Sequence, residues 1–153
     1  MNFSEDIPLA DLIPYKRSRF QTRLPKHRLY TASHFWLAEV EAGLWRVGFT
    51  RFATRMLGEI VESGFEVKNN EPVRVGQVIG WMEGFKALSD LFCVADGAFA
   101  GGNPAADADA TLIDKKPYAQ GWLYQIRGTP DPNSMPVEKY IQLLDATIDK
   151  MTS

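Results

Sequence analysis

The chain has 153 residues, of which 45% are hydrophobic and 24% are charged, and its formal net charge is −2. This is the length and composition of an ordinary soluble globular protein with one main domain and a real core. No apolar run approaches the roughly 20 residues of a membrane-spanning helix, so we expect no membrane association.

Residues 1–28 are predicted to form an N-terminal extension that differs in charge from the rest of the chain. Six basic residues and no acid lie in residues 16–28, namely Lys16, Arg17, Arg19, Arg23, Lys26 and Arg28. Such a segment can dock on a negative partner surface or on the acidic body, although a solvated and mobile segment is the more common case. Only Phe20 interrupts it, so the stacking platform of a nucleic-acid binder is missing and we expect no nucleic acid as partner.

From residue 29 onward the chain has the pattern of many short strands. Runs rich in β-branched and aromatic residues occupy residues 29–31, 36–40, 44–49, 59–62, 66–68, 77–82, 87–94, 98–99 and 121–126. Turn residues separate several of these runs at residues 41–43, 63–64, 69–72, 83–84 and 96–97, and residues 101–109 have the composition of a loop. This spacing predicts a mainly β protein, a small antiparallel sandwich or barrel.

Two helices are predicted within and after these strands. Thr50 is a suitable N-cap and Gly58 a suitable C-terminal residue for a short internal helix of about two turns. Near the C-terminus, apolar residues recur at spacings of three, four and seven: Val137, Tyr140, Ile141, Leu144, Ile148 and Met151. They predict an amphipathic C-terminal helix of about four turns, laid against the sheet.

The single cysteine and the two histidines carry no recognisable chemistry. Cys93 excludes an intrachain disulfide, and its apolar neighbours indicate that it is buried. With no secretory pattern at the N-terminus, we expect a cytoplasmic protein. His27 and His34 have no companions at metal-ligand spacing, so we predict no metal site and a structural role for His34.

Lys86 is the residue with the most informative surroundings. It follows the turn residues at 83–84, and the two carboxylates of Glu83 and Asp90 lie three residues before and four residues after it. A turn at Gly84–Phe85 would place the lysine at the exposed apex of a hairpin. Most lysines near turns are solvated surface charges, so the position alone does not establish a function.

Four motifs in a fixed order indicate that this lysine is more than a solvated surface charge. The segment Glu83-Gly-Phe-Lys86-Ala-Leu-Ser-Asp90-Leu-Phe is similar to the lipoylation motif E-S-V-K-A-x-S-D-L-Y. Three further motifs follow the order of the same family: Tyr30-Thr-Ala-Ser-His34-Phe-Trp36, Val47-Gly-Phe-Thr50 with Ala53 and Leu57-Gly-Glu-Ile-Val61, and Pro117-Tyr-Ala-Gln-Gly121-Trp-Leu123. Over residues 29–150 the chain thus resembles the H-protein family of the glycine cleavage system.

The resemblance implies a fold, a cofactor and a set of site residues. The implied fold is the barrel-sandwich hybrid of lipoyl and biotinyl carriers, with residues 29–153 as the lipoyl domain. The implied cofactor is lipoic acid, joined by an amide to Lys86 by a lipoate ligase or lipoyl transferase. Glu83, Gly84 and Asp90 would orient the hairpin or help the ligase recognise it. The protein would then be a non-catalytic carrier rather than an enzyme.

Departures from the motifs bear on the pathway. Gly84-Phe85 replaces Ser-Val, Phe92-Cys93-Val94 replaces Tyr-Ser-Pro, and Phe35 replaces a glutamate. These changes favour the related lipoate-binding proteins of sulfur oxidation, whose partner is a heterodisulfide-reductase-like complex. The alternative is a true glycine cleavage H protein, which works with glycine decarboxylase, aminomethyltransferase and dihydrolipoyl dehydrogenase.

Two further hypotheses stay open. A biotinyl carrier has a similar hairpin, but biotin domains favour methionine on both sides of the lysine, and here the neighbours are Phe85 and Ala87. An unmodified interaction module could keep the fold without the cofactor.

Overall fold

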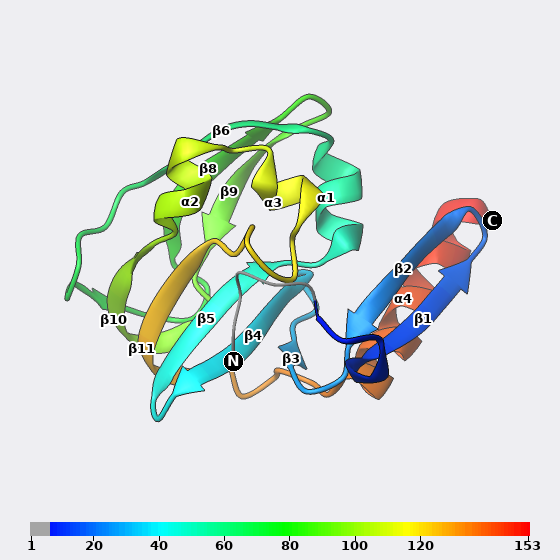
Figure 1. Cartoon of the computed structure of the whole chain (residues 1–153), viewed down its shortest axis with the longest axis horizontal. Helices are drawn as coiled ribbons and strands as arrows, with labels where there is room; N and C mark the ends of the chain where they lie inside the picture. Colours follow the sequence, from blue (N-terminus) through cyan, green and yellow to red (C-terminus); the bar gives the residue numbers. More distant parts are fainter. Residues whose placement is uncertain (1–6) are drawn as a thin grey trace.

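Two packed antiparallel sheets form the body of the computed structural model, which describes residues 7–153 (Figure 1). The larger sheet has six strands in the order β3 (Leu29–Tyr30), β4 (Phe35–Glu41), β5 (Leu44–Phe49), β11 (Tyr124–Pro130), β10 (Ala95–Gly102) and β7 (Pro72–Val73). The smaller sheet has three, in the order β6 (Ile60–Phe65), β8 (Val78–Gly84) and β9 (Leu88–Phe92). The predicted mainly β architecture is confirmed.

The main core lies between these two sheets. Fully buried side chains from both of them meet there, including Leu37, Val47, Ile79, Met82, Leu91, Tyr124 and Ile126. Burying one such side chain contributes about 1.5–3 kcal/mol, so this layer supplies most of the stabilisation of the body. Cys93 is only 1% exposed within the same core, as its apolar neighbours predicted.

The predicted internal helix is confirmed as α1 (Arg51–Leu57). Thr50 is its N-cap and accepts a hydrogen bond from the N–H of Ala53 at 3.4 Å. Gly58 ends the helix with a φ of 78°, a left-handed conformation that glycine adopts without strain, and its N–H donates to the carbonyl of Thr54. The hairpin predicted around residues 41–43 is also confirmed, between β4 and β5.

Two of the predicted turns are wrong because strand pairing continues through them. Ser63 and Gly64 lie inside β6 and pair with Met82 and Trp81 of β8, whereas residues 66–68 lie outside the strands. Residues 96–97 lie inside β10, where Asp96 accepts a hydrogen bond from the N–H of Val75 instead of forming its own turn. In both places, contacts with neighbouring segments keep the residues in a strand instead of a turn.

The region predicted as a loop at residues 101–109 contains the end of β10 and a short helix, α2 (Pro104–Ala108). Asn103 caps this helix through the N–H of Ala105, at 3.0 Å. A further helix, α3 (Leu112–Lys115), was not predicted. The strand predicted from residue 121 begins at residue 124. Just before it, the side-chain amide of Asn103 donates hydrogen bonds to the carbonyls of Gln120 and Trp122.

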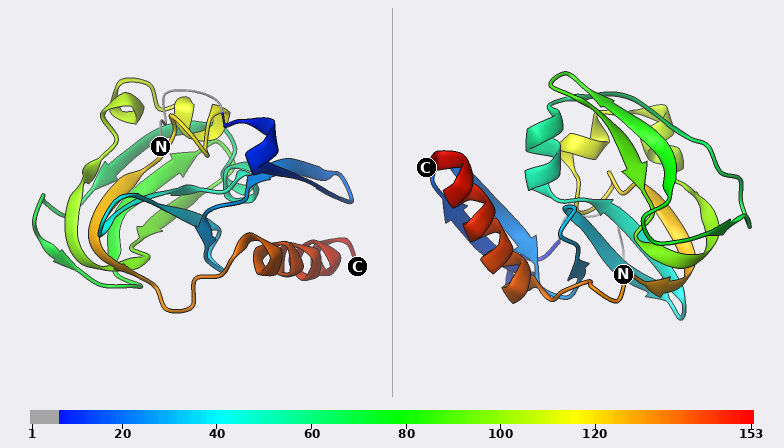
Figure 2. Two further views of the ribbon diagram at one scale, coloured as in Figure 1. Left: turned by 60° about the horizontal axis from the view of Figure 1, so that its bottom comes forward. Right: turned by 180° about the vertical axis from the view of Figure 1, so that it is seen from behind.

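A separate lobe beside the body combines residues 9–25 with the C-terminal helix (Figure 2). It contains the 3-10 turn η1 (Leu9–Asp11), the hairpin β1 (Leu12–Arg17) with β2 (Phe20–Pro25), and the C-terminal helix α4 (Val137–Thr152). The expectation of a solvated, mobile segment is therefore wrong for residues 12–25. Apolar side chains alternate along both strands and cover the apolar face of α4: Tyr15, Phe20 and Leu24 against Tyr140, Leu144 and Ile148.

The predicted amphipathic helix is confirmed in α4, but its partner differs from the prediction. It packs on the hairpin and β3 rather than along the face of the main sheet. Arg17 also binds Asp149 with two hydrogen bonds of 2.8 Å, a bidentate arrangement that orients the hairpin on the helix. Residues 12–25 thus share a core with the C-terminal helix, and the division of the chain at residue 28 stays a prediction.

Candidate functional site

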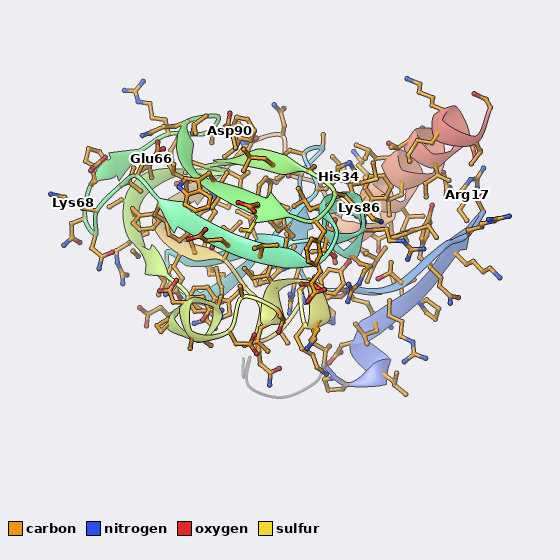
Figure 3. All side chains as sticks on the ribbon, turned by 90° about the horizontal axis from the view of Figure 1, so that it is seen from above. Arg17, His34, Glu66, Lys68, Lys86 and Asp90 are labelled. Carbon is orange, nitrogen blue, oxygen red and sulfur yellow. The ribbon has the colours of Figure 1, made fainter. Side chains whose placement is uncertain are left out.

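The β8–β9 turn presents Lys86 at one end of the three-stranded sheet (Figure 3). β8 ends at Gly84 and β9 begins at Leu88. Three exposed residues connect them: Phe85, Lys86 and Ala87. The turn thus lies one residue later than predicted, since Gly84 belongs to the strand and donates its N–H to the carbonyl of Ala87 at 2.9 Å. Lys86 is the middle residue of the connection.

The C-terminal end of α1 holds this turn in place. The N–H of Lys86 donates to the carbonyl of Leu57 at 2.9 Å, and the N–H of Phe85 donates to the carbonyl of Glu59 at 3.0 Å. The last carbonyls of a helix have no partner within the helix, and here the turn supplies a hydrogen-bond donor for one of these carbonyls. Gly84 passes so close to this end that a Cβ atom would collide with the carbonyl oxygen of Leu57. Backbone hydrogen bonds and close packing therefore hold the turn against the end of α1.

The side chain of Lys86 lies along the same helix end. Its stem passes Gly58, where a Cβ atom would come within 3.0 Å of the lysine Cγ. Its ammonium group donates to the carbonyl of Arg55 at 3.2 Å, at the end of the helix that carries partial negative charge. An amide at Nζ would lose the positive charge but keep one N–H for this carbonyl. The exposed position and its single acceptor therefore suit a lysine that carries an acyl group.

Glu83 and Asp90 lie on the outer face of the three-stranded sheet rather than beside the ammonium group. In the β8–β9 register, Glu83 faces Leu88 and Asp90 faces Trp81. Both carboxylates are exposed, and within residues 7–153 neither forms an ion pair with Lys86, whose side chain turns toward α1. Figure 3 shows Asp90 and Lys86 at separate places along the hairpin. The two acids therefore do not hold the lysine in place.

Sequence reasoning missed two features of this site. Phe85 and Leu88 are 76% and 72% exposed, and exposed apolar side chains beside a presented group indicate a surface for another protein. The phenylalanine in place of the motif's valine was the available signal. The contact with Arg55 and Leu57 was also missed, because nothing in the sequence relates α1 to a turn some thirty residues later.

The remaining candidate residues are structural. Burial raises the pKa of the Cys93 thiol, whose Sγ lies 3.1 Å from the carbonyl oxygen of Ala95. Burial lowers the pKa of His34 to about 4, and its Nδ1 lies 2.8 Å from the hydroxyl oxygen of Tyr140. Within residues 7–153, no group of three or more histidine, cysteine or acidic side chains could hold a metal ion. In the same part of the chain, no helix is long and apolar enough to cross a membrane.

Comparison with known proteins identifies the family. Residues 28–147 match the family model described as glycine cleavage H-protein. The chain belongs to the glycine cleavage H-protein family. The glycine cleavage system H protein of Corynebacterium jeikeium is 35% identical over 122 residues, which cover 78% of this chain and 95% of that protein. That of Micrococcus luteus is 36% identical over 104 residues, covering 67% and 80% respectively.

A solved member of the family has the same architecture. The crystal structure of a glycine cleavage system H protein from Mycobacterium marinum matches with a TM-score of 0.68 at 34% identity, and covers 76% of this chain and 95% of that one. The predicted barrel-sandwich hybrid is therefore confirmed. Members of the H-protein family are lipoyl carriers with lipoic acid covalently attached to a lysine, so this chain is a carrier and not an enzyme.

Proposed function

We propose that Lys86 is the lysine to which lipoic acid is attached. Its support is the combination of a lipoylation-like motif with an exposed turn that the rest of the structure holds rigidly. An enzyme that modifies a lysine must take the amine into its own active site, so the turn has to stand clear of the body while its backbone stays fixed. The three exposed residues of the connection meet the first requirement, and the contacts with α1 meet the second.

The attachment forms an amide between the carboxyl carbon of lipoate and Nζ of Lys86. The ligase first joins the lipoate carboxylate to the AMP part of ATP with release of pyrophosphate; the neutral amine then attacks the carboxyl carbon, AMP leaves and the nitrogen loses one proton. The lipoyl group, once bound, supplies a disulfide at the end of a flexible arm that accepts and releases groups. The chain's own residues present the arm. The turn fixes its origin, and the tether keeps its reactive end at high effective concentration near each docked partner.

Glu83, Gly84 and Asp90 would serve recognition by the ligase in this proposal. Gly84 lets the turn approach α1, and the carboxylates of Glu83 and Asp90 project from the outer face of the hairpin. Glu62 lies directly opposite Glu83 on β6, and like charges in such a pair are destabilising. The presence of this unfavourable pair supports a contact with another protein rather than a role in folding.

The pathway best supported is glycine cleavage, in which the arm carries the aminomethyl group of glycine between enzymes. The relatives named above are glycine cleavage system H proteins, and the match covers 95% of the length of one of them. The partners would be glycine decarboxylase, aminomethyltransferase and dihydrolipoyl dehydrogenase. The comparisons do not support the sulfur-oxidation role that the sequence had placed first, nor the heterodisulfide-reductase-like complex as partner. A cytoplasmic location stays a prediction.

Sulfur oxidation is kept as a second candidate because of specific residues. Gly84, Phe85, Phe92 and Cys93 depart from the family motif; Gly84 ends the strand before the presented turn, and Phe85 is the turn's first residue. Changes at that place alter the surface that a partner enzyme meets. A lipoylated protein that fails with glycine cleavage partners but is used by a heterodisulfide-reductase-like complex would reverse the order of the two candidates.

The attachment is tested by expression with lipoate and a lipoate ligase, followed by intact-mass analysis. We expect one lipoyl adduct on the wild type and on the control Lys68→Arg, and none on Lys86→Arg. An adduct that persists in Lys86→Arg would show that the assignment is wrong, and a streptavidin-positive product would indicate a biotinyl carrier. Native protein with an unmodified Lys86 would support the interaction module.

The pathway is tested with the lipoylated protein. We expect it to support glycine decarboxylation with glycine decarboxylase, and release of the bound methylene group with aminomethyltransferase and tetrahydrofolate. Absence of both activities, with the adduct present, would contradict the glycine cleavage role and leave the carrier assignment intact.

A further inference from the structure

Exposed apolar side chains gather around the Lys86 turn. Within residues 7–153, eight large apolar side chains are exposed, and half of them lie here: Met56, Val61, Phe85 and Leu88. The other four lie in the lobe or at the opposite end of the β8–β9 hairpin. Single exposed apolar residues are normal, whereas a group of them around a presented side chain indicates a contact surface. We call these four residues the apolar collar.

Met56 reaches the collar from the end of α1. The carbonyl of the residue before it, Arg55, accepts the hydrogen bond from the ammonium group of Lys86 at 3.2 Å. The carbonyl of the residue after it, Leu57, accepts a hydrogen bond from the backbone N–H of Lys86 at 2.9 Å. The backbone and the amine of the lysine are therefore both bound to residues that adjoin Met56.

Val61 reaches the collar from β6. In the pairing of β6 with β8, Ile60 faces Gly84 and Glu62 faces Glu83, so Val61 is an extra residue between two consecutive pairs. Such a bulge turns one side chain out of the regular ladder. Val61 therefore lies beside the last two residues of β8, directly before the turn.

The enzyme that attaches the lipoyl group has to approach this collar. It acts on Nζ of Lys86, and this atom lies against the end of α1, beside Met56. Phe85 directly precedes the lysine, and Leu88 follows it by two residues. A catalytic site cannot reach Nζ without bringing its walls close to these side chains. An enzyme that acts on the disulfide of the lipoyl arm meets it one further carbon chain away, so it can work without touching the collar.

We propose that the apolar collar is the docking surface for the enzyme that attaches the lipoyl group, and that Phe85 and Leu88 are its main contacts. The inference rests on the function proposed above. Removing these side chains from water favours binding, and large aromatic side chains commonly contribute most at the centre of an interface. Phe85 stands where the lipoylation motif has valine, so this chain presents a larger apolar group beside its lysine. Phe85 is therefore a specificity-determining residue for the attachment.

The test measures the kinetics of lipoylation of the purified full-length protein by a lipoate ligase, with lipoate and ATP, followed by intact mass. The collar variant is Phe85→Ala with Leu88→Ala, and Phe85→Val restores the residue of the motif. The matched control is Leu9→Ala with Met151→Ala, which removes two exposed apolar side chains from the lobe. Thermal unfolding should be nearly unchanged in all three variants, since the replaced side chains are exposed.

We expect the KM for the carrier to rise about tenfold in the collar variant, with kcat within about twofold of the wild type. A tenfold rise corresponds to about 1.4 kcal/mol of lost binding. Phe85→Val should raise the KM about threefold, and the control should stay within about twofold of the wild type.

A competition experiment measures docking without the chemistry. The variant Lys86→Arg keeps the collar but lacks the acceptor amine, so it should inhibit lipoylation of the wild type competitively. Adding Phe85→Ala and Leu88→Ala to this inhibitor should raise its inhibition constant about tenfold. An inhibition constant that does not change would contradict the docking role.

Equal KM values for the collar variant and the control would overturn the docking inference and leave Lys86 as the attachment residue. The inference would also be overturned if the collar variant, once lipoylated, lost affinity for glycine decarboxylase while its KM with the ligase stayed unchanged. A wild-type dimer in sedimentation that the collar variant dissociates, again with an unchanged KM, would assign the collar to a second copy instead. Failure of the wild type to accept a lipoyl group under any condition would overturn the proposed function, and the docking inference with it.

Discussion

The hydroxyl group of Tyr140 donates a 2.8 Å hydrogen bond to Oγ1 of Thr50 and so joins α4 to the N-cap of α1. Nδ1 of His34 lies 2.8 Å from the same hydroxyl oxygen. Because the Tyr140 proton points to Thr50, His34 is the donor in the second contact. At its other end, α1 binds the backbone of Lys86 through Leu57. One short helix thus connects the lobe to the presented turn.

Removing the Tyr140 hydroxyl should weaken this connection. We expect Tyr140→Phe to lower the free energy of unfolding by about 1–2 kcal/mol, because Thr50 and His34 then lose a buried partner. Urea unfolding measures the change. In a Thr50→Ala background, Tyr140→Phe should lower the free energy of unfolding by less, since the hydrogen bond to Thr50 is already absent. An equal decrease in both backgrounds would argue against the hydrogen bond between Tyr140 and Thr50.

The neutral state of His34 predicts a dependence of stability on pH. Burial lowers its pKa to about 4 in the folded protein, whereas an unfolded histidine has a pKa of about 6.5. Between these values the unfolded state binds more protons, so the free energy of unfolding should fall as the pH drops from about 6.5 to about 4. For this one group the full loss is about 3 kcal/mol.

His34→Asn should remove this dependence while keeping the fold. His34 has a φ of 71°, which asparagine tolerates, and its side-chain amide can donate to Tyr140. Carboxylates titrate in the same pH range and also change the stability. The relevant quantity is therefore the difference in the free energy of unfolding between wild type and variant, measured by chemical denaturation at several pH values. A constant difference from pH 4 to pH 7 would contradict the prediction.

The close approach of Gly84 to α1 should make this position intolerant of any side chain. In Gly84→Ala, the added Cβ would meet the carbonyl oxygen of Leu57, so either the turn or the helix end must shift. We expect a loss of about 2–3 kcal/mol in urea unfolding, and slower lipoylation in the mass assay. Ser89→Ala is the control, because its hydroxyl bonds only to the backbone of Asp90. Wild-type stability in Gly84→Ala would refute this packing.

The lobe should lose stability before the body when its core is opened. Phe20 is 8% exposed and packs against Tyr15 and Phe52, so Phe20→Ala should cost about 3 kcal/mol. Hydrogen exchange should show faster exchange in β1 and β2 while β8 and β9 stay protected. Leu9→Ala, at a residue 70% exposed, should change stability by less than about 0.5 kcal/mol. Uniform loss of protection would mean that lobe and body unfold together.

Elements defined by local chemistry could be predicted from the sequence. Thr50 and Gly58 marked the ends of α1, and the apolar spacing from Val137 onward marked α4. The motif around Lys86 led to the family and the cofactor. Each of these signals depends on residues a few positions apart, whose preferences act over one or two turns of chain.

Contacts between distant segments could not be predicted in the same way. The turn-forming residues at 63–64 and 96–97 lie within strands, because they pair with residues of neighbouring strands rather than forming local turns. The hairpin found its place on α4, where Tyr15 binds Asp145 across 130 positions of sequence. In the hairpin, basic residues of the outer face lie between the apolar residues of the inner face, so the alternation was not recognised in the sequence.

The sequence by itself therefore determined the family, the β-rich architecture and the lysine at the centre of the proposed site. Only the tertiary structure decided how that lysine is held. The carbonyls of Arg55 and Leu57 become available because a short helix ends beside the turn, and this end has no partner of its own.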